Sequence, residues 1–170
     1  MSEKSVKEAV SFGERLAASQ AFADLFRDGM ALVEQTAAYL DGPGRQEAKR
    51  LSRNAALAYA TESMRLTTRL MQLASWLLLH RAVKEGEMTL AQANKEKAKV
   101  KLATAEYNDE QKNIKLLPER LRALIERSKA LQRAVRRLDA TMHATPSRAD
   151  RGNPVEHQIG LLKAAFEQER

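Results

Sequence analysis

The side chains that could do chemistry in this chain are few and lie far apart in the sequence. The three histidines, His80, His143 and His157, are isolated, and none has a glutamate three residues before it. The Glu-x-x-His pairs of di-iron bundles are therefore absent, and so is the zinc-protease helix motif. The chain has no cysteine, which excludes disulfides, thiolate metal sites and cysteine nucleophiles.

Other catalytic arrangements are missing as well. No glycine-rich loop follows a strand pattern, so the phosphate-cradling motifs are not found. A nucleophilic serine would need an oriented base nearby, and no sequence pattern supplies one. We therefore predict that the protein is not an enzyme, with no catalytic residues, no metal site and no cofactor.

The elements of the fold are predicted to be helices. Apolar residues make up 44% of the 170 residues, charged residues 30% and aromatic residues 5%. The commonest residues are good helix formers, and no strand pattern competes with them. The most apolar run, residues 70–79, is flanked by Arg69 and Arg81 and is shorter than the roughly 20 residues of a membrane span. We expect a soluble, cytoplasmic all-α protein with no membrane segment.

A first helix is predicted to begin at Ser19 and to end at the turn formed by residues 41–44. The turn contains two glycines, which can adopt the left-handed conformation after a helix, and a proline, which cannot continue one. Residues 1–18 have weak periodicity, and we expect them to form a weakly ordered N-terminal segment. The apolar stripe of this helix consists of Phe22, Phe26, Val33 and Leu40, widened by Leu25, Leu32 and Tyr39.

A second helix is predicted to begin between Gln46 and Asn54 and to end near Glu85, before Gly86. It is apolar on two faces, so it must be covered on two sides. We place it at the centre of the bundle, with a second copy of the chain as the additional cover, which predicts a homodimer. One face carries the candidate core or dimer-interface residues Leu66, Leu70, Leu73, Trp76 and Leu77, and the other carries Met64, Met71, Ala74 and Leu78.

Two further helices follow. Thr89 and Gln92 form a capping-box pattern for a short third helix. Pro118 suits the first position of a fourth helix, which has a coiled-coil-like seam. These elements predict an antiparallel three-helix bundle with a short extra helix, over residues 19–143. The seam positions are Leu117, Leu121, Leu124, Ser128, Leu131, Val135, Leu138 and Met142.

Residues 144–170 are predicted to be a linker and a tethered amphipathic tail helix. Pro146 and Gly152 indicate the linker, and Asn153 can cap the helix with Pro154 at its first position. The tail could fold back on the bundle or dock into a partner's groove, and we favour an element that docks intermittently. Its docking residues are Val155, Ile159, Leu162 and Phe166.

Two charged groups have alternative interpretations. Glu62, Arg65 and Arg69 share one side of the second helix, where they could form a recognition surface or only a solvated network within the helix. The net charge is +7, and a basic stretch at 120–137 could contact phosphates or simply solvate the fourth helix. No recognition-helix turn, zinc knuckle or stacking aromatic accompanies it, so the sequence disfavours nucleic acid as a partner.

Three stretches carry a resemblance to a known family. They are residues 22–30 (FADLFRDGM), 39–45 (YLDGPGR) and 58–78 (AYATESMRLTTRLMQLASWLL), followed by GEMT at 86–89. With them the chain resembles the regulator of CtrA degradation (RcdA) family of alphaproteobacteria. The resemblance is close over about residues 19–102, and 117–139 is similar to that family's last bundle helix. Residues 103–114, both termini and the tail depart from the family pattern.

The resemblance implies a non-enzymatic adaptor for the ClpXP protease. Such homodimeric adaptors bind protein substrates and deliver them to a protease that a response-regulator-like partner has primed. They also recruit a cyclic-di-GMP-binding adaptor, and so time the destruction of cell-cycle regulators. The family is cytoplasmic and gathers at a cell pole. The alternative from the charge pattern is a small basic nucleic-acid-binding regulator.

The resemblance also suggests where partners bind. The turn after the first helix matches a family string and is expected to be exposed, as are three charged residues of the first helix. We therefore take as candidate partner contacts Asp24, Arg27, Asp28, Asp41, Gly42, Gly44 and Arg45, together with the charged group Glu62, Arg65 and Arg69. Their alternative role is local geometry, as a helix stop and a solvent-facing surface.

Overall fold

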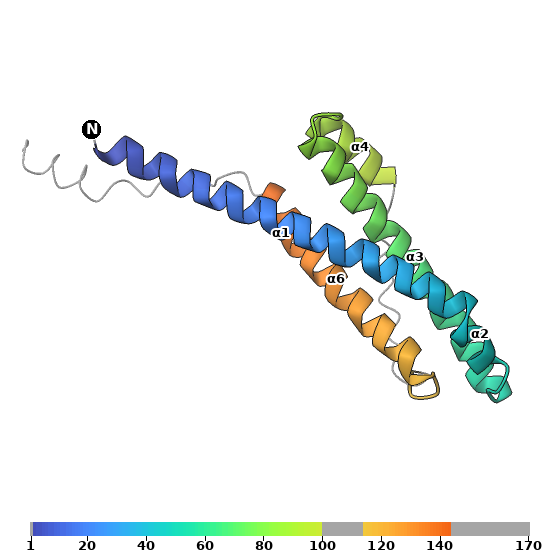
Figure 1. Ribbon diagram of the computed structural model, residues 1–170. Helices are drawn as coiled ribbons and strands as arrows, with labels where there is room; N and C mark the ends of the chain where they lie inside the picture. Colours follow the sequence, from blue (N-terminus) through green and yellow to red (C-terminus); the bar gives the residue numbers. More distant parts are fainter. Residues whose placement is uncertain (1, 100–113, 144–170) are drawn as a thin grey trace, which may run out of the picture. The chain divides into compact units, whose positions relative to one another are not determined.

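The fold is all-α, as the sequence predicts. The computed structural model describes residues 2–99 and 114–143 of the chain, and within these it contains five helices and no strand (Figure 1). The predicted linker and tail, with Val155, Ile159, Leu162 and Phe166, lie outside the described residues. The chain divides into two compact units, residues 1–138 and 139–170, and in the second only residues 139–143 are described.

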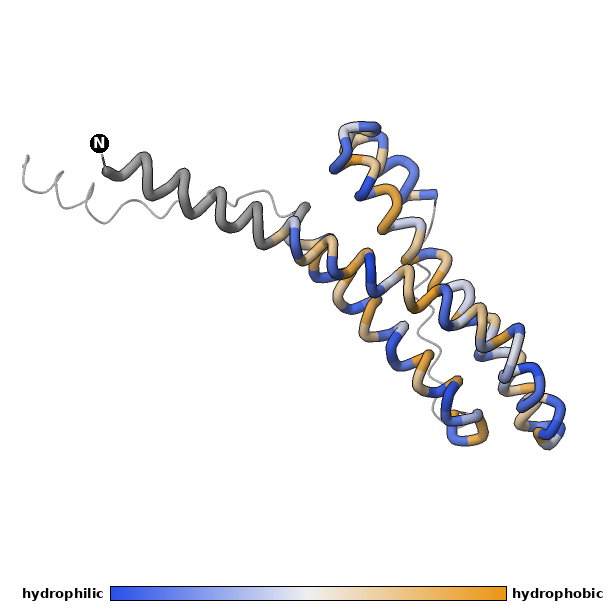
Figure 2. The backbone as a smooth tube through the Cα atoms, viewed as in Figure 1, coloured by the Kyte–Doolittle hydropathy of each residue, from blue (hydrophilic) through white to orange (hydrophobic). Residues whose placement is uncertain are grey.

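The first unit contains three long helices. They are α1 (Ser2–Asp41), α3 (Arg53–Lys84) and most of α6 (Glu119–His143). The helical backbone of α1 starts at Ser2, well before the apolar pattern that led us to expect a start at Ser19. Apolar and polar residues alternate along the described part of each long helix (Figure 2), as expected for helices that bury one side.

Capping residues set the ends of α3. The Ser52 hydroxyl accepts a hydrogen bond from the Ala55 backbone N–H at 3.4 Å, which satisfies one of the free donors at the start of the helix. The helix ends before Gly86, whose φ of +76° is a conformation that glycine adopts without strain. Both ends agree with the predicted boundaries.

Two short helices connect the long ones. The predicted capping box starts α4 (Leu90–Lys99): the Thr89 N–H donates to Gln92 Oε1 at 2.9 Å, and the Gln92 N–H donates to Thr89 Oγ1 at 3.2 Å. The helix α2 (Pro43–Ala48) lies where the sequence analysis expected only a turn. Pro43 at its first position is the signal that was available, because proline suits the first turn of a helix.

The helices α1 and α3 are antiparallel and pack closely. Ser19 of α1 lies opposite Lys84 at the end of α3. Gly44, which follows α1 in the short helix α2, lies opposite Tyr59 near the start of α3. Between these ends, Gly29 allows the backbones to approach, because a Cβ atom there would lie 2.6 Å from Leu77 Cδ1. Leu131 of α6 reaches the same glycine, so all three long helices meet at this level.

The core confirms the predicted seam of the fourth helix. Leu117, Leu121, Leu124, Leu131 and Val135 are buried, and Leu138 is partly buried against them. The polar seam residue Ser128 is also fully buried; its hydroxyl donates to the Ile125 carbonyl at 2.7 Å and accepts from Arg69 at 2.9 Å. These bonds offset the cost of burying a hydroxyl in the seam.

Candidate functional site

The outer face of α3 is apolar and exposed within the described chain. It consists of Leu57, Met64, Met71 and Leu78, which are 70%, 72%, 67% and 52% exposed. These residues are spaced by seven, so they form one line along the helix, and the small residues Ala60, Thr67 and Ala74 lie between them. The sequence analysis identified this face but missed Leu57. We refer to these four residues as the α3 outer face.

The opposite face of α3 is used inside the single chain. Leu66, Leu70, Leu73, Trp76 and Leu77 are all at most 4% exposed and belong to the core. The Trp76 ring lies 6.3 Å from that of Phe22 and 4.1 Å from that of His80, which is itself buried. These residues therefore hold the bundle together, and the α3 outer face is the part of the helix that remains available.

The candidate contacts on α1 are exposed. Asp24 and Asp28 both pair with Arg27, at 3.2 and 3.3 Å, and all three side chains remain more than 60% exposed. Exposed pairs of this kind contribute little to stability, so their side chains are free to exchange partners. Asp41 and Arg45 form a similar exposed pair at 3.7 Å across the turn.

One residue that was predicted to contact a partner is not at the surface. Gly44 was expected to be exposed with its neighbours, and this is wrong: Gly44 is buried, and Gly42 is half-buried. A Cβ atom at Gly44 would lie 2.6 Å from the Tyr59 hydroxyl and 2.7 Å from the Tyr39 carbonyl oxygen. The glycine is therefore required by the close packing of α2 against α1 and α3.

The charged group on α3 is mostly internal. The Glu62 side chain is 6% exposed and accepts a hydrogen bond from Arg65 at 2.6 Å. Arg69 reaches across to Ser128 of α6. Glu62 is thus buried against the bundle, whereas Arg65, whose side chain is 32% exposed, and Arg69 are both partly exposed.

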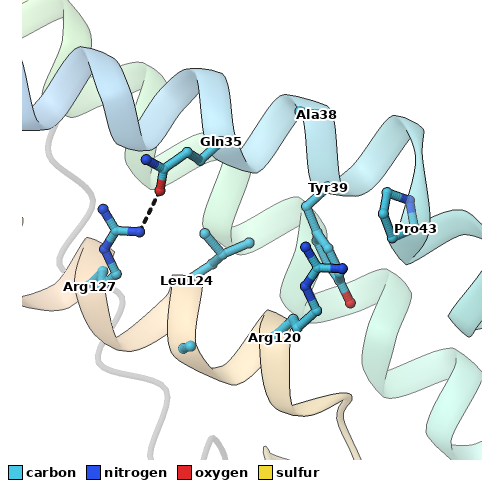
Figure 3. Close-up of a pocket in the computed structure, with 8 residues that line it drawn as sticks. Gln35, Ala38, Tyr39, Pro43, Arg120, Leu124 and Arg127 are labelled. Carbon is cyan, nitrogen blue, oxygen red and sulfur yellow. Dashed lines mark hydrogen bonds between the residues drawn. The ribbon is translucent and has the colours of Figure 1, made fainter.

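A cleft of about 480 Å³ opens between the end of α1 and the start of α6 (Figure 3). Two arginines of α6 line it. The Arg120 guanidinium carbon lies 5.6 Å from the centre of the Tyr39 ring, and Arg127 Nη1 donates to Gln35 Oε1 at 2.5 Å. We call it the arginine cleft; its lining residues are Gln35, Ala38, Tyr39, Pro43, Arg120, Ala123, Leu124 and Arg127.

The Tyr39 hydroxyl donates a hydrogen bond of 2.6 Å to the Glu47 carboxylate. Burial raises the pKa of the Tyr39 phenol, and the bond to Glu47 raises it further. The phenol therefore stays protonated at neutral pH and keeps the ring in place at the edge of the arginine cleft. Sequence reasoning missed this site, because its residues come from helices whose relative register the sequence does not give.

Within residues 2–99 and 114–143, no group of three or more histidine, aspartate or glutamate side chains could hold a metal ion. In the same part of the chain, no helix is long and apolar enough to cross a bilayer. The described surface presents an apolar face, exposed ion pairs and a cationic cleft.

Comparisons with known proteins identify the family of the chain. Residues 13–166 match the family described as "Protein of unknown function (DUF1465)". The crystal structure of RcdA from Caulobacter crescentus CB15 is similar to this chain, with 55% sequence identity and a TM-score of 0.56. That likeness covers 71% of this chain and 89% of the RcdA chain. This chain belongs to the RcdA family.

Family membership bears out the resemblance drawn from residues 22–30, 39–45 and 58–78. No curated protein matches the chain at a significant level. The surfaces considered below therefore rest on the geometry of the described residues, and the α3 outer face and the arginine cleft are two of them.

Proposed function

We propose that this protein is a non-enzymatic adaptor that binds protein substrates and delivers them to the primed ClpXP protease. The 55% identity to RcdA over most of that chain is the observation that carries the proposal. The exposed α3 outer face supports it, because an apolar line of this length is typical of a surface that another protein covers.

Delivery of this kind needs no chemistry from the adaptor. An adaptor that holds a substrate beside the protease raises the local concentration of the substrate, so a weak degradation signal is engaged more often. The protease supplies ATP hydrolysis and peptide cleavage. The proposal includes the partners that the family implies: a response-regulator-like priming adaptor, a cyclic-di-GMP-binding adaptor, and a cytoplasmic location at a cell pole.

We further propose that two copies of the chain pair through the α3 outer face. Leu57, Met64, Met71 and Leu78 repeat every seven residues, which is the spacing of a helix seam that packs against another helix. Small residues between them would let the two helices approach. A homodimer of this kind is isologous, with the same face contributed by both copies.

Protein turnover in cells tests the adaptor role. Half-lives are measured across the proteome in wild-type cells, in cells that lack this protein, and in cells depleted of ClpX. We expect a subset of the proteins stabilised by ClpX depletion to be stabilised also when this protein is absent. If no ClpX-dependent protein changes its half-life, the proposed function is wrong.

The second candidate is a small basic nucleic-acid-binding regulator. The exposed arginines of α6, including Arg122, Arg133, Arg136 and Arg137, are the observation that favours it. Binding to random duplex DNA is measured as the salt concentration is raised. A regulator that neutralises several phosphates would lose affinity steeply with salt, whereas we expect only weak binding at low salt.

A further inference from the structure

We propose that the arginine cleft is a second partner-binding site, which takes an extended acidic peptide segment of another protein. The ligand has two carboxylates, one for each arginine, on either side of an apolar side chain. The site shares no residue with the α3 outer face. The proposal goes beyond substrate delivery, because it assigns to the chain a binding surface that would work without the protease.

Charge is the first argument. Arg120 and Arg127 both line the cleft, and among residues 2–99 and 114–143 neither guanidinium lies within ion-pair distance of a carboxylate. Three exposed arginines elsewhere differ from them in this respect: Arg27 of α1, Arg45 of α2 and Arg81 of α3 each pair with a nearby acid. Two cations in one concave site that have no acidic partner in the described part of the chain are complementary to an anionic ligand.

Both arginines are held in place before a ligand arrives. Arg120 lies over the Tyr39 ring, with its guanidinium carbon 5.6 Å from the ring centre, and this contact uses none of its N–H donors. Arg127 uses Nη1 for Gln35 and retains its other donors. Figure 3 shows the two side chains extending from α6 toward α1, with Leu124 between them. Groups that are ordered in advance lose less conformational entropy when they bind.

The spacing and the lining define the class of ligand. Arg120 and Arg127 are seven residues apart on α6, which corresponds to about 10 Å along a helix. An extended peptide in the polyproline II conformation covers about that distance in three residues, and residues three positions apart then lie on the same side. Leu124 lies between the arginines (Figure 3), and the cleft is also lined by Ala38, Pro43 and Ala123; these residues suit an apolar side chain.

These features favour a peptide over a nucleic acid. A phosphate backbone has no apolar group to place on Leu124 and Ala123, and the cleft has no free aromatic face for a base because Arg120 covers Tyr39. A carboxylate peptide satisfies both parts of the site, with charge at its ends and apolar contact in the middle.

The test is a binding titration with the full-length protein and a fluorescent peptide. The probe carries two glutamates three positions apart, with a leucine between them, in a glycine-serine background. A matched peptide has glutamine in place of both glutamates, and a second has lysine. We expect the glutamate peptide alone to bind wild-type protein, and an absence of preference for glutamate over glutamine would overturn the proposal.

Variants locate the site. Arg120→Glu and Arg127→Glu are each expected to weaken binding of the glutamate peptide by about tenfold or more, since each removes a charge-assisted hydrogen bond. The control is Arg122→Glu, which makes the same change in net charge at an exposed position outside the cleft; it is expected to weaken binding by no more than about twofold. Equal losses in all three variants would show general attraction only and would contradict the site.

Reversing the charge of both the protein and the peptide distinguishes loss of the site from poor folding of a variant. The Arg127→Glu protein is expected to gain affinity for the lysine peptide, which a misfolded protein would not do. Arg120→Gln and Arg127→Gln are milder variants, whose helicity is checked by circular dichroism. Each should lose less affinity for the glutamate peptide than the glutamate variant at the same position. Duplex DNA that displaces the peptide from wild-type protein, with binding lost in the same two variants, would assign the cleft to nucleic acid instead.

Because this assay contains no protease, it separates the two proposals. Peptide binding without any effect on turnover would leave the cleft site in place and remove the delivery role. Delivery without peptide binding would leave the delivery role in place and remove the cleft site.

Discussion

Single side chains join the helices at the end of the bundle where the arginine cleft lies. Tyr39 of α1 donates to Glu47 of α2, and its ring contacts Arg120 of α6. One residue therefore links three helices. Gly44 is buried beside it, against Tyr59 of α3. The local geometry of this region depends on these few contacts, which makes it sensitive to single substitutions.

Tyr39→Phe is expected to lower the free energy of unfolding by about 1 kcal/mol at neutral pH, because the hydrogen bond to Glu47 is lost. The difference depends on pH in a defined direction. The fold raises the pKa of the Tyr39 phenol above its ordinary value near 10, so the stabilisation is complete below about pH 10 and falls as the pH rises above it. Urea unfolding of both proteins from neutral to alkaline pH measures this; a difference that stays constant would contradict the role of the phenol.

Gly44→Ala is expected to destabilise the protein by about 1–3 kcal/mol, because the added methyl group would collide with the Tyr39 carbonyl oxygen and the Tyr59 hydroxyl. The control is Gln46→Ala, an exposed position in the same short helix, for which we expect a change within about 0.5 kcal/mol. Thermal unfolding compares the two variants. Equal melting temperatures would show that the α1–α2 turn tolerates a side chain.

At the scale of the elements, α3 has two apolar faces with different uses. The inner face packs against α1 and α6 through Leu66, Leu73 and Leu77, and the outer face carries Leu57, Met64, Met71 and Leu78 in the open. An exposed apolar line of this kind is typical of a surface that another protein covers. The proposed homodimer provides that cover.

Met71→Glu is expected to produce a folded monomer. Each copy would bury a glutamate in the symmetric seam, so the cost of desolvating the two charges opposes association, whereas the single chain keeps an exposed residue exposed. The control Ala130→Glu places the same charge on an exposed position of α6 and is expected to leave the dimer intact. Sedimentation velocity measures the mass; a Met71→Glu dimer of unchanged affinity would move the interface elsewhere.

The sequence predicted best the helix ends that are set by residues close by in the sequence. Ser52, Gly86 and the Thr89–Gln92 pair act within a few residues of themselves, so the ends of α3 and the start of α4 could be predicted. The burial of Gly44 could not, because it depends on Tyr59, which lies on another helix. The arginine cleft was missed for the same reason: Arg120 and Arg127 meet Tyr39 and Gln35 only in the packed register of α1 and α6.

At the scale of the whole molecule, the sequence predicted the class of protein better than the site. Missing motifs indicated no catalytic centre, and the strings at 22–30, 39–45 and 58–78 indicated the RcdA family, which the comparison confirms. The contact residues Asp24, Arg27 and Asp28 remain predictions, because exposure on α1 is compatible with a partner without identifying one. Partner choice depends on surfaces that helical periodicity alone does not specify.

The most direct measurement of the central claim is a reconstituted degradation assay. Purified ClpXP, the priming adaptor and a substrate whose half-life depends on this protein are combined with increasing amounts of the full-length chain. We predict that the initial rate of substrate loss rises with the concentration of the chain. The rate then falls when the chain is in excess, because substrate and protease occupy separate adaptor molecules. A rate that does not change at any concentration, with the substrate bound to the chain, would contradict the adaptor role.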